Sequence, residues 1–313
     1  MVIQNAILVA TQVLILFILI AVGFTARKVK MIDDNGQYQM TNILLMIVTP
    51  AMIVKSFQIP FETALLNGLL IAAASAVMTH IVGAVLAMIV FRRQPAAKGR
   101  VLKFAVVFVN CGFMCIPLLN AVLGTRGVFF GSIYIAVYYI LLWTYGVILM
   151  TGQGKDISFF KALFNPSLVA IMIGLPLFLL GIKIPAVPAA VINFLGSINS
   201  PLAMIIIGGQ IAGLSLATLF KVRQVYVISL LRLLIVPAVI MLGLHIFPLN
   251  RELIIACLIP AAAPAAVATA LFATRYGQDK ELAAQAVALT TIFSIITIPL
   301  MIMLSDLIGG SLL

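Results

Sequence analysis

The sequence is poor in charge, and acidic residues are its scarcest charged group. Only 9% of the 313 residues are Asp, Glu, Lys or Arg, and eight of these are acidic. Soluble domains carry about a quarter of their residues as charged side chains, so a soluble core with a polar surface is excluded. Hydrophobic residues make up 64% of the chain, and its mean hydropathy is +1.26. We therefore expect an integral membrane protein.

Cysteine and histidine are also rare, with three and two residues. Three cysteines make neither a disulfide framework nor a zinc site, and Cys111 and Cys115 are expected to be packing residues. The chain has no His-Glu-x-x-His or Gly-x-Ser-x-Gly motif, and no carboxylate pair within an apolar run. Intramembrane proteases need one of these arrangements. We therefore expect no enzyme, no metal and no cofactor.

Long apolar runs dominate the sequence instead. A bilayer core of about 30 Å needs roughly 20 apolar residues in a helix. Cutting the chain at its charged and Gly/Pro-rich breaks gives ten such segments, at residues 6–26, 40–57, 65–91, 104–124, 127–150, 165–180, 190–216, 224–247, 253–273 and 282–308. The runs are continuous rather than alternating, which favours helices over barrel strands. The expected fold is all-α, with ten transmembrane helices.

Basic residues are unevenly divided between alternate loops. With the N-terminus outside, one set of loops holds only Lys55, Arg126, Lys183 and Arg251. The other set holds Arg27, Lys28, Lys30, Arg92, Arg93, Lys98, Arg100, Lys103, Lys155, Lys161, Lys221, Arg223, Arg275 and Lys280. Basic loops stay in the cytoplasm, so both termini are expected outside the cell membrane. The net charge of +11 then reflects topology and attraction to anionic lipid, and no nucleic-acid partner is expected.

Two parts of the chain repeat. The stretch NILLMIVTPAMI begins at Asn42 and NFLGSINSPLAMI at Asn193, and each reaches a proline at the same spacing. GTRG at Gly124 recurs loosely as ATRYG at Ala273, again about 150 residues later. Five helices per half is an odd number, so the second copy must enter the membrane from the opposite side. This predicts inverted repeats over residues 1–151 and 165–313, joined by a short cytoplasmic connector at 152–164.

Helix-breaking residues fall inside the fourth and ninth segments. NCGFMCIP starts at Asn110 and ends at Pro117, and IPAAAPAAVATALF contains Pro260 and Pro264. Proline removes a backbone N–H and clashes with the carbonyl one turn back, and glycine loosens the same turn. Both helices are expected to unwind near the bilayer centre and to cross there. Half-helix N-termini carry partial positive charge and free N–H donors, so the crossing point suits an anion.

Few ionisable side chains fall deep in the apolar runs, and none is a carboxylate, which favours an anionic or neutral substrate. Arg232 in the eighth segment is expected either to snorkel to the cytoplasmic interface or to act as a counter-charge to substrate. His80 in the third segment is expected to make a polar contact between helices or, alternatively, to relay protons. Both are candidates for a charge or proton role.

Several motifs in a fixed order resemble the auxin efflux carrier family, within the bile-acid, arsenite and auxin transporter superfamily. They are VTPAMI, NCGFMCIPLLNAVLG, NPSLVAIMIGLPL, SPLAMIIIGGQIAG, RLLIVP, PAAAPAAVATALFATRYG and TTIFSIITIPL. The resemblance implies a five-plus-five inverted repeat in which the fourth and ninth helices are broken and cross. It also implies a scaffold of helices 1, 2, 6 and 7, which would form a homodimer interface, and a moving unit made of the other helices.

The resemblance carries a substrate site to this sequence, residue by residue. The implied substrate-binding residues are Asn110, Cys111, Gly112, Pro117, Pro260, Ala261, Ala263 and Pro264. The long cytosolic loop of the plant members is missing, and short members are linked with small acids such as malonate and malate. The expected function is secondary transport of such an organic anion by alternating access. A sodium-coupled symporter like the bile-acid relatives and a non-transporting sensor of the same ligands are the alternatives.

Overall fold

The computed structural model describes residues 2–153, 163–213 and 222–311. Its regular elements in these ranges are helices, in the order α1 (Val2–Lys28), α2 (Asp34–Ile43), η1 (Leu44–Val48), α3 (Thr49–Ser56), α4 (Thr63–Val90), α5 (Ala96–Val107), η2 (Cys111–Cys115), α6 (Ile116–Leu141), η3 (Leu142–Gly146), α7 (Val147–Thr151), α9 (Pro166–Leu179), α10 (Ala186–Ser197), α11 (Asn199–Ala212), α13 (Arg223–Leu230), η4 (Leu231–Ile235), α14 (Val236–His245), α15 (Arg251–Ala262), α16 (Ala268–Arg275) and α17 (Lys280–Ser311). The η stretches are π-helical turns. The all-α class is confirmed for the described part of the chain.

Several expectations fall outside that part. Most of the expected connector at 152–164 lies beyond the described residues, as does the end of the seventh expected segment. The same holds for Lys155, Lys161 and Lys221 of the basic loops.

Six continuous helical runs in the described ranges are long and apolar enough to cross a membrane. They are Asp34–Ser56, Thr63–Val90, Cys111–Thr151, Ala186–Ala212, Arg223–His245 and Lys280–Gly309. The shorter Pro166–Leu179 is also apolar. The protein is therefore a multi-pass membrane protein. Within the described ranges, the runs do not coincide one for one with the ten expected segments, because hydropathy counts apolar residues and does not detect where a helix stops or continues.

The run Cys111–Thr151 shows this most clearly, because it contains most of the fourth expected segment and all of the fifth. The two are separated at Gly124, which has φ +63° and ψ −148° inside the run. That conformation is open almost only to glycine. One residue thus replaces the loop that the sequence suggested.

The fourth helix begins earlier than its apolar run indicates. The expected start was residue 104, whereas α5 covers Ala96–Val107. Lys98, Arg100 and Lys103, which were expected in a loop, therefore lie on the helix. Lys and Arg are good helix formers, and their long stems let the charge reach water from a helix end. A count of apolar residues therefore misses helical turns that carry charged side chains.

Three of the four π turns in the described ranges have a proline two residues after they end. Pro50, Pro117 and Pro237 are each the second residue of the α-helical stretch that follows η1, η2 and η4. Proline has no N–H for the carbonyl four residues earlier, and its ring pushes that carbonyl away. The wider i→i+5 turn accommodates this displacement. These prolines therefore coincide with wide turns within the helices.

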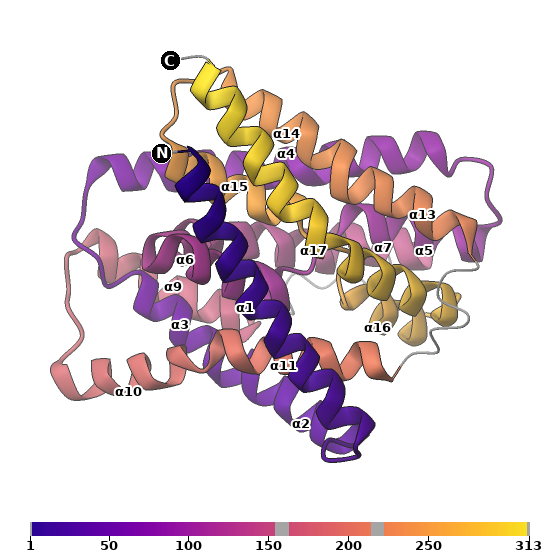
Figure 1. The fold of residues 1–313 in the computed structure, drawn as a ribbon, viewed down its shortest axis with the longest axis horizontal. Helices are drawn as coiled ribbons and strands as arrows, with labels where there is room; N and C mark the ends of the chain where they lie inside the picture. Colours follow the sequence, from indigo (N-terminus) through magenta and orange to yellow (C-terminus); the bar gives the residue numbers. More distant parts are fainter. Residues whose placement is uncertain (1, 154–162, 214–221, 312–313) are drawn as a thin grey trace.

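Helix α1 packs closely across α11, and the two cross in the foreground of Figure 1. A Cβ added at Gly23 would lie 2.1 Å from the carbonyl oxygen of Ile205, and one at Gly208 would lie 2.0 Å from that of Ile20. No side chain fits at either position. Small residues of this kind let membrane helices approach backbone to backbone.

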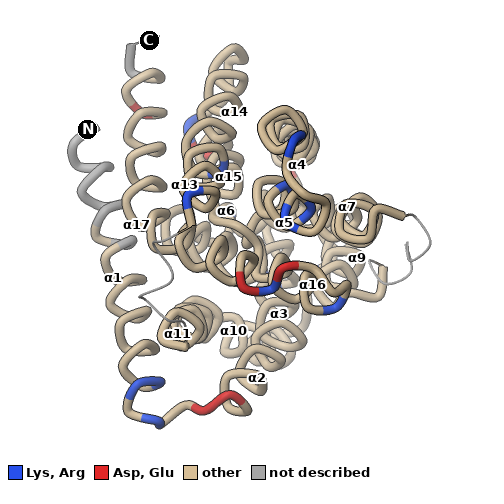
Figure 2. Tube along the Cα trace, turned by 90° about the vertical axis from the view of Figure 1, so that its right-hand side faces the viewer, with Lys and Arg blue, Asp and Glu red and all other residues tan. Residues whose placement is uncertain are grey.

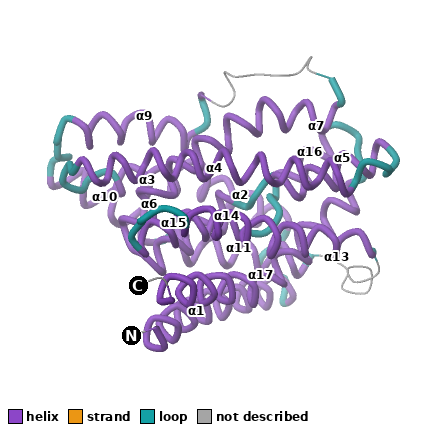
Figure 3. Tube along the Cα trace, turned by 90° about the horizontal axis from the view of Figure 1, so that it is seen from above, coloured by secondary structure: helices purple, strands orange, loops and turns teal. Residues whose placement is uncertain are grey.

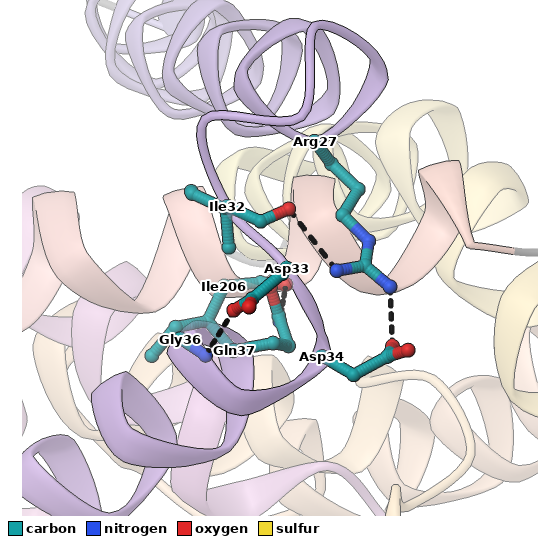
Figure 4. Close-up of polar contacts among 7 residues, drawn as sticks. All are labelled: Arg27, Ile32, Asp33, Asp34, Gly36, Gln37 and Ile206. Atoms are coloured by element: carbon teal, nitrogen blue, oxygen red, sulfur yellow. Dashed lines mark hydrogen bonds and ion pairs between the residues drawn. The ribbon is translucent and has the colours of Figure 1, made fainter.

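The turn between α1 and α2 is also fastened to α11 (Figure 4). Arg27 forms an ion pair with Asp34 at the start of α2. The Asp33 carboxylate accepts a hydrogen bond from the backbone in the first turn of α2. Gln37 reaches across and donates from its amide nitrogen to the carbonyl of Ile206, at 2.6 Å. The start of α2 is thereby held against the middle of α11.

Helix α1 also packs against α17, and the two lie together along one edge of the molecule when seen from above (Figure 3). Several basic helix ends gather elsewhere, on the right-hand side of Figure 1. Figure 2 faces that side, with Lys and Arg in blue. Arg223 is the first residue of α13, and Arg275 is the last residue of α16.

Candidate functional site

Two helical paths are interrupted, and the two interruptions pair with each other. Helix α5 ends at Val107 and η2 begins at Cys111, while α15 ends at Ala262 and α16 begins at Ala268. The Asn110 N–H donates to the Pro264 carbonyl at 2.9 Å, and the Ala266 N–H donates to the Phe108 carbonyl at 2.9 Å. Val109 and Ala265 form an antiparallel bridge between them. The unwound segments 108–110 and 263–267 therefore satisfy part of each other's backbone.

Further support for the pairing comes from α17. The Ala265 N–H donates to the hydroxyl of Thr290 at 3.1 Å, and Thr290 is fully buried. Phe108, Val109 and Ala265 are also fully buried. Unwound backbone at membrane depth is tolerated only where protein or a polar cavity satisfies it. The bonds between the two unwound segments and the bond to Thr290 satisfy the backbone with protein groups on one side of the interruption.

A cavity of about 200 Å³ lies on another side of the interruption. Asn110, Gln210 and Thr291 are its polar lining residues. The apolar ones are Ile207, Ile211, Val267, Ala270, Ala284, Val287 and Ala288. The wall therefore combines α11, α16 and α17 with the residue that precedes η2.

The residues that precede two helix starts line this cavity. Asn110 precedes the helical run that begins at Cys111, and Val267 precedes α16. Neither is capped by a side-chain hydrogen bond. The first N–H groups of a helix have no partner within it, and they carry partial positive charge. The cavity wall is therefore suited to negative charge.

Sequence comparison identifies the kind of protein that holds this cavity. Residues 8–302 match the family model described as "Membrane transport protein". The chain belongs to this family of membrane transport proteins. The family is that of the auxin efflux carriers, so the resemblance in the motifs is confirmed.

Two archaeal relatives align over nearly the full length of this transport protein. One is an uncharacterized transporter of Methanothermobacter thermautotrophicus, 22% identical over 296 residues, which cover 92% of this chain and 95% of the relative. The other is an uncharacterized transporter of Methanocaldococcus jannaschii, 24% identical over 305 residues, covering 92% and 96%.

Only Asn110, of the eight residues carried over by resemblance, lines the cavity of the transport protein. It is 3% exposed. Cys111, Pro260, Ala261, Ala263 and Pro264 are buried in the packing around the interruption, and Gly112 is half-buried. Pro117 lies beyond the unwound segment, in the first turn of α6. The interruption in the first half therefore precedes its proline and contains none.

Nine of the ten lining residues were not predicted, including Gln210, Thr291 and Val267. Gln210 and Thr291 are polar residues inside apolar runs, and Gln210 even stands within the quoted motif SPLAMIIIGGQIAG. A polar residue inside an apolar run was the signal in the sequence that could have identified these two. Val267 carried no signal, because its role comes from its backbone position before α16.

Arg232 corrects one expectation about the transport protein. Its side chain is fully buried and donates four hydrogen bonds to backbone carbonyls at the ends of α5 and α15. It therefore does not snorkel to an interface. It is also absent from the residues that line the cavity.

His80 is 4% exposed and packs its ring near Phe108, Tyr134 and Tyr138. Its Nδ1 lies 2.7 Å from the carbonyl of Ala76 in its own helix. Its Nε2 is buried without a partner among the described residues. The hydrogen bond that the ring makes is therefore within α4, and its other nitrogen is left without one.

Proposed function

We propose that the protein is a secondary transporter of a small organic anion, a carboxylate or dicarboxylate such as malonate or malate, by alternating access. The observation that carries the proposal is that Asn110 and Val267, the residues before two helix starts, line one cavity. Together they offer N–H donors and positive potential without a fixed cation, a known arrangement for binding anions.

The cavity chemistry supports a small carboxylate. Asn110 and Gln210 each provide amide donors and a carbonyl acceptor, and Thr291 provides a hydroxyl. None of the described residues that line the cavity is acidic, so a cation has no counter-charge there. A volume of about 200 Å³ is below the range of about 300–1,000 Å³ for drug-sized ligands. The size fits an acid of a few carbons.

The proposed architecture is a five-plus-five inverted repeat, with halves at residues 1–151 and 165–313. Paired interruptions in α5 and α15 support it, since each half contributes one. The segments before Pro50 and Pro201 give further support, because the α-helix is irregular in both. The π turn η1 lies shortly before Pro50, and the break between α10 and α11 lies shortly before Pro201. Asn199 donates to Thr49 at 2.9 Å, and both are fully buried. In this scheme α11 belongs to a scaffold, and α16 and α17 belong to a moving unit.

The proposed orientation places both termini outside the cell membrane, since basic residues concentrate in the opposite loops. A cysteine introduced at Lys183 should be labelled by an impermeant thiol reagent added from outside. One introduced at Arg93 should react only when the cytoplasmic face is opened. Labelling of intact and permeabilised cells measures this. The reverse pattern would overturn the orientation.

Binding of an acid and its amide provides the test of substrate class. Purified protein should bind malonate more tightly than malonamide, because helix starts favour negative charge. A ligand that binds the folded state raises its melting temperature, so a thermal-shift comparison gives the ranking. Equal binding of acid and amide would contradict the anion assignment. Counterflow in proteoliposomes then separates transport from sensing, since a sensor binds without flux.

A further inference from the structure

Arg232 is a fully buried charge in η4 that does not contact the cavity. Four hydrogen bonds hold its guanidinium, and each acceptor is a backbone carbonyl. Nε donates to Ala263 at 3.0 Å, and Nη2 donates to Ala261 at 2.7 Å and Pro260 at 3.3 Å. Nη1 donates to Val106 at 3.3 Å. Three acceptors therefore belong to the end of α15, and one belongs to the end of α5.

These carbonyls are available because the two helices stop. In an unbroken helix, the Pro260 carbonyl would accept from residue 264, but Pro264 has no N–H, and the carbonyl accepts instead from the Ala263 N–H at 3.3 Å and from Arg232. The Ala261 carbonyl would accept from Ala265, whose N–H is bonded to Thr290 instead. The Val106 carbonyl would accept from Asn110, whose N–H is bonded to the Pro264 carbonyl. Arg232 supplies donors to carbonyls whose regular helical partners the interruptions removed.

The charge of Arg232 also matches the ends that it contacts. A helix C-terminus carries about half an elementary negative charge. Two such ends nearly cancel one guanidinium, which keeps its charge when buried. Because Arg232 cancels these negative ends, they do not offset the positive charge at the two helix starts beside the cavity. Each of those starts carries about half an elementary positive charge.

We propose that Arg232 is a positioning residue that joins the two interrupted helices into one unit and cancels the negative ends of both. The inference rests on the proposed function, because it makes Arg232 the source of anion preference in a cavity that it does not touch. The planar guanidinium is required, since its separate N–H groups reach carbonyls of both helices. Lys keeps the charge but places its donors at one point.

Hydrogen–deuterium exchange tests the joining role without any ligand. The amides of Phe108, Asn110, Ala265 and Ala266 report on the interruption because their N–H groups bond across or beside it. In Arg232→Met, exchange should become faster in peptides covering both 104–112 and 259–268. Arg126→Met is the matched control, since Arg126 is half exposed and pairs only with Glu252 among the described residues. It should leave both peptides unchanged.

Arg232→Lys keeps the test decisive if the Met variant does not fold. Lys should hold the three carbonyls of α15 and lose Val106, so only the peptide over 104–112 should exchange faster. Protection of both peptides as in the parent, in either folded variant, would overturn the joining role. Loss of protection at one segment alone in Arg232→Met would also overturn it.

The charge role has its own readout, which a purely structural role would not change. The ratio of malonate to malonamide affinity should fall about tenfold in Arg232→Met, within the range of helix-dipole effects, and Arg232→Lys should retain it. An unchanged ratio in a folded Arg232→Met would overturn the charge role. If the parent protein binds neither compound, the proposed function fails for this substrate class, and the exchange experiment still decides whether Arg232 joins the helices.

Discussion

Asn110→Ala is expected to weaken carboxylate binding by about 1–3 kcal/mol, which is about 5- to 150-fold in affinity. Asn110 is the polar residue at the interruption that also lines the cavity. Its side chain does not cap the helix that follows, so the amide is available to a ligand. Its backbone N–H holds the pairing to Pro264, and alanine keeps that bond. The fold should therefore survive while binding is lost.

Asn193→Ala is the control for this variant, because Asn193 is an exposed residue of α10. Malonate binding is measured by titration on purified, monodisperse protein, and uptake is measured in proteoliposomes. Asn193→Ala should match the parent in both. If Asn110→Ala also matches the parent, the substrate site lies elsewhere.

Gly208→Ala should produce a large loss of stability through the α1–α11 contact. The added Cβ would lie 2.0 Å from the Ile20 carbonyl oxygen and 2.7 Å from the Phe24 backbone nitrogen. Backbone atoms cannot turn aside as a flexible side chain does, so α1 and α11 must separate. Overpacking of this kind costs about 1–3 kcal/mol. Thermal unfolding in detergent should show a clear fall in melting temperature.

The same variant should also affect binding, because Gln210 lies half a turn further along α11 and lines the cavity. Gly243→Ala is the control, since a Cβ there meets no atom within 4 Å. Alanine is preferred over glycine in a helix interior, so this control should not lower stability. Equal melting temperatures for Gly208→Ala and the parent would show that the two helices can separate without cost.

The ninth helix shows how far the sequence could predict the candidate site. Pro260 and Pro264 mark its interruption directly, because proline removes specific hydrogen bonds. The fourth helix gives no such mark, since residues 108–110 are Phe, Val and Asn, and its nearby Pro117 lies in α6. That interruption depends on pairing with residues 264–266, which are far away in sequence. Tertiary contacts therefore placed one of the two breaks.

Arg232 shows a second limit. A buried arginine in an apolar run signals a special role, and the sequence predicted that much. Its partners are backbone carbonyls, which every residue has, so no side chain could identify them. Only the positions of the helix ends distinguish these carbonyls from all others.

The π turn at η4 explains how one helical run keeps a single buried side. Buried residues recur there every four positions, at Ile228, Arg232, Val236, Ile240 and Leu244. In a regular α-helix, a period of four drifts by about 40° per repeat, so four repeats would carry Leu244 about 160° away from Ile228. One additional residue in a wide turn takes back about 100° of that drift. If η4 tightened to a regular α-helical turn with the same residues, the part of the helix after it would rotate by about 100° relative to the part before it, so that Ile228 and Leu244 would lie on different sides.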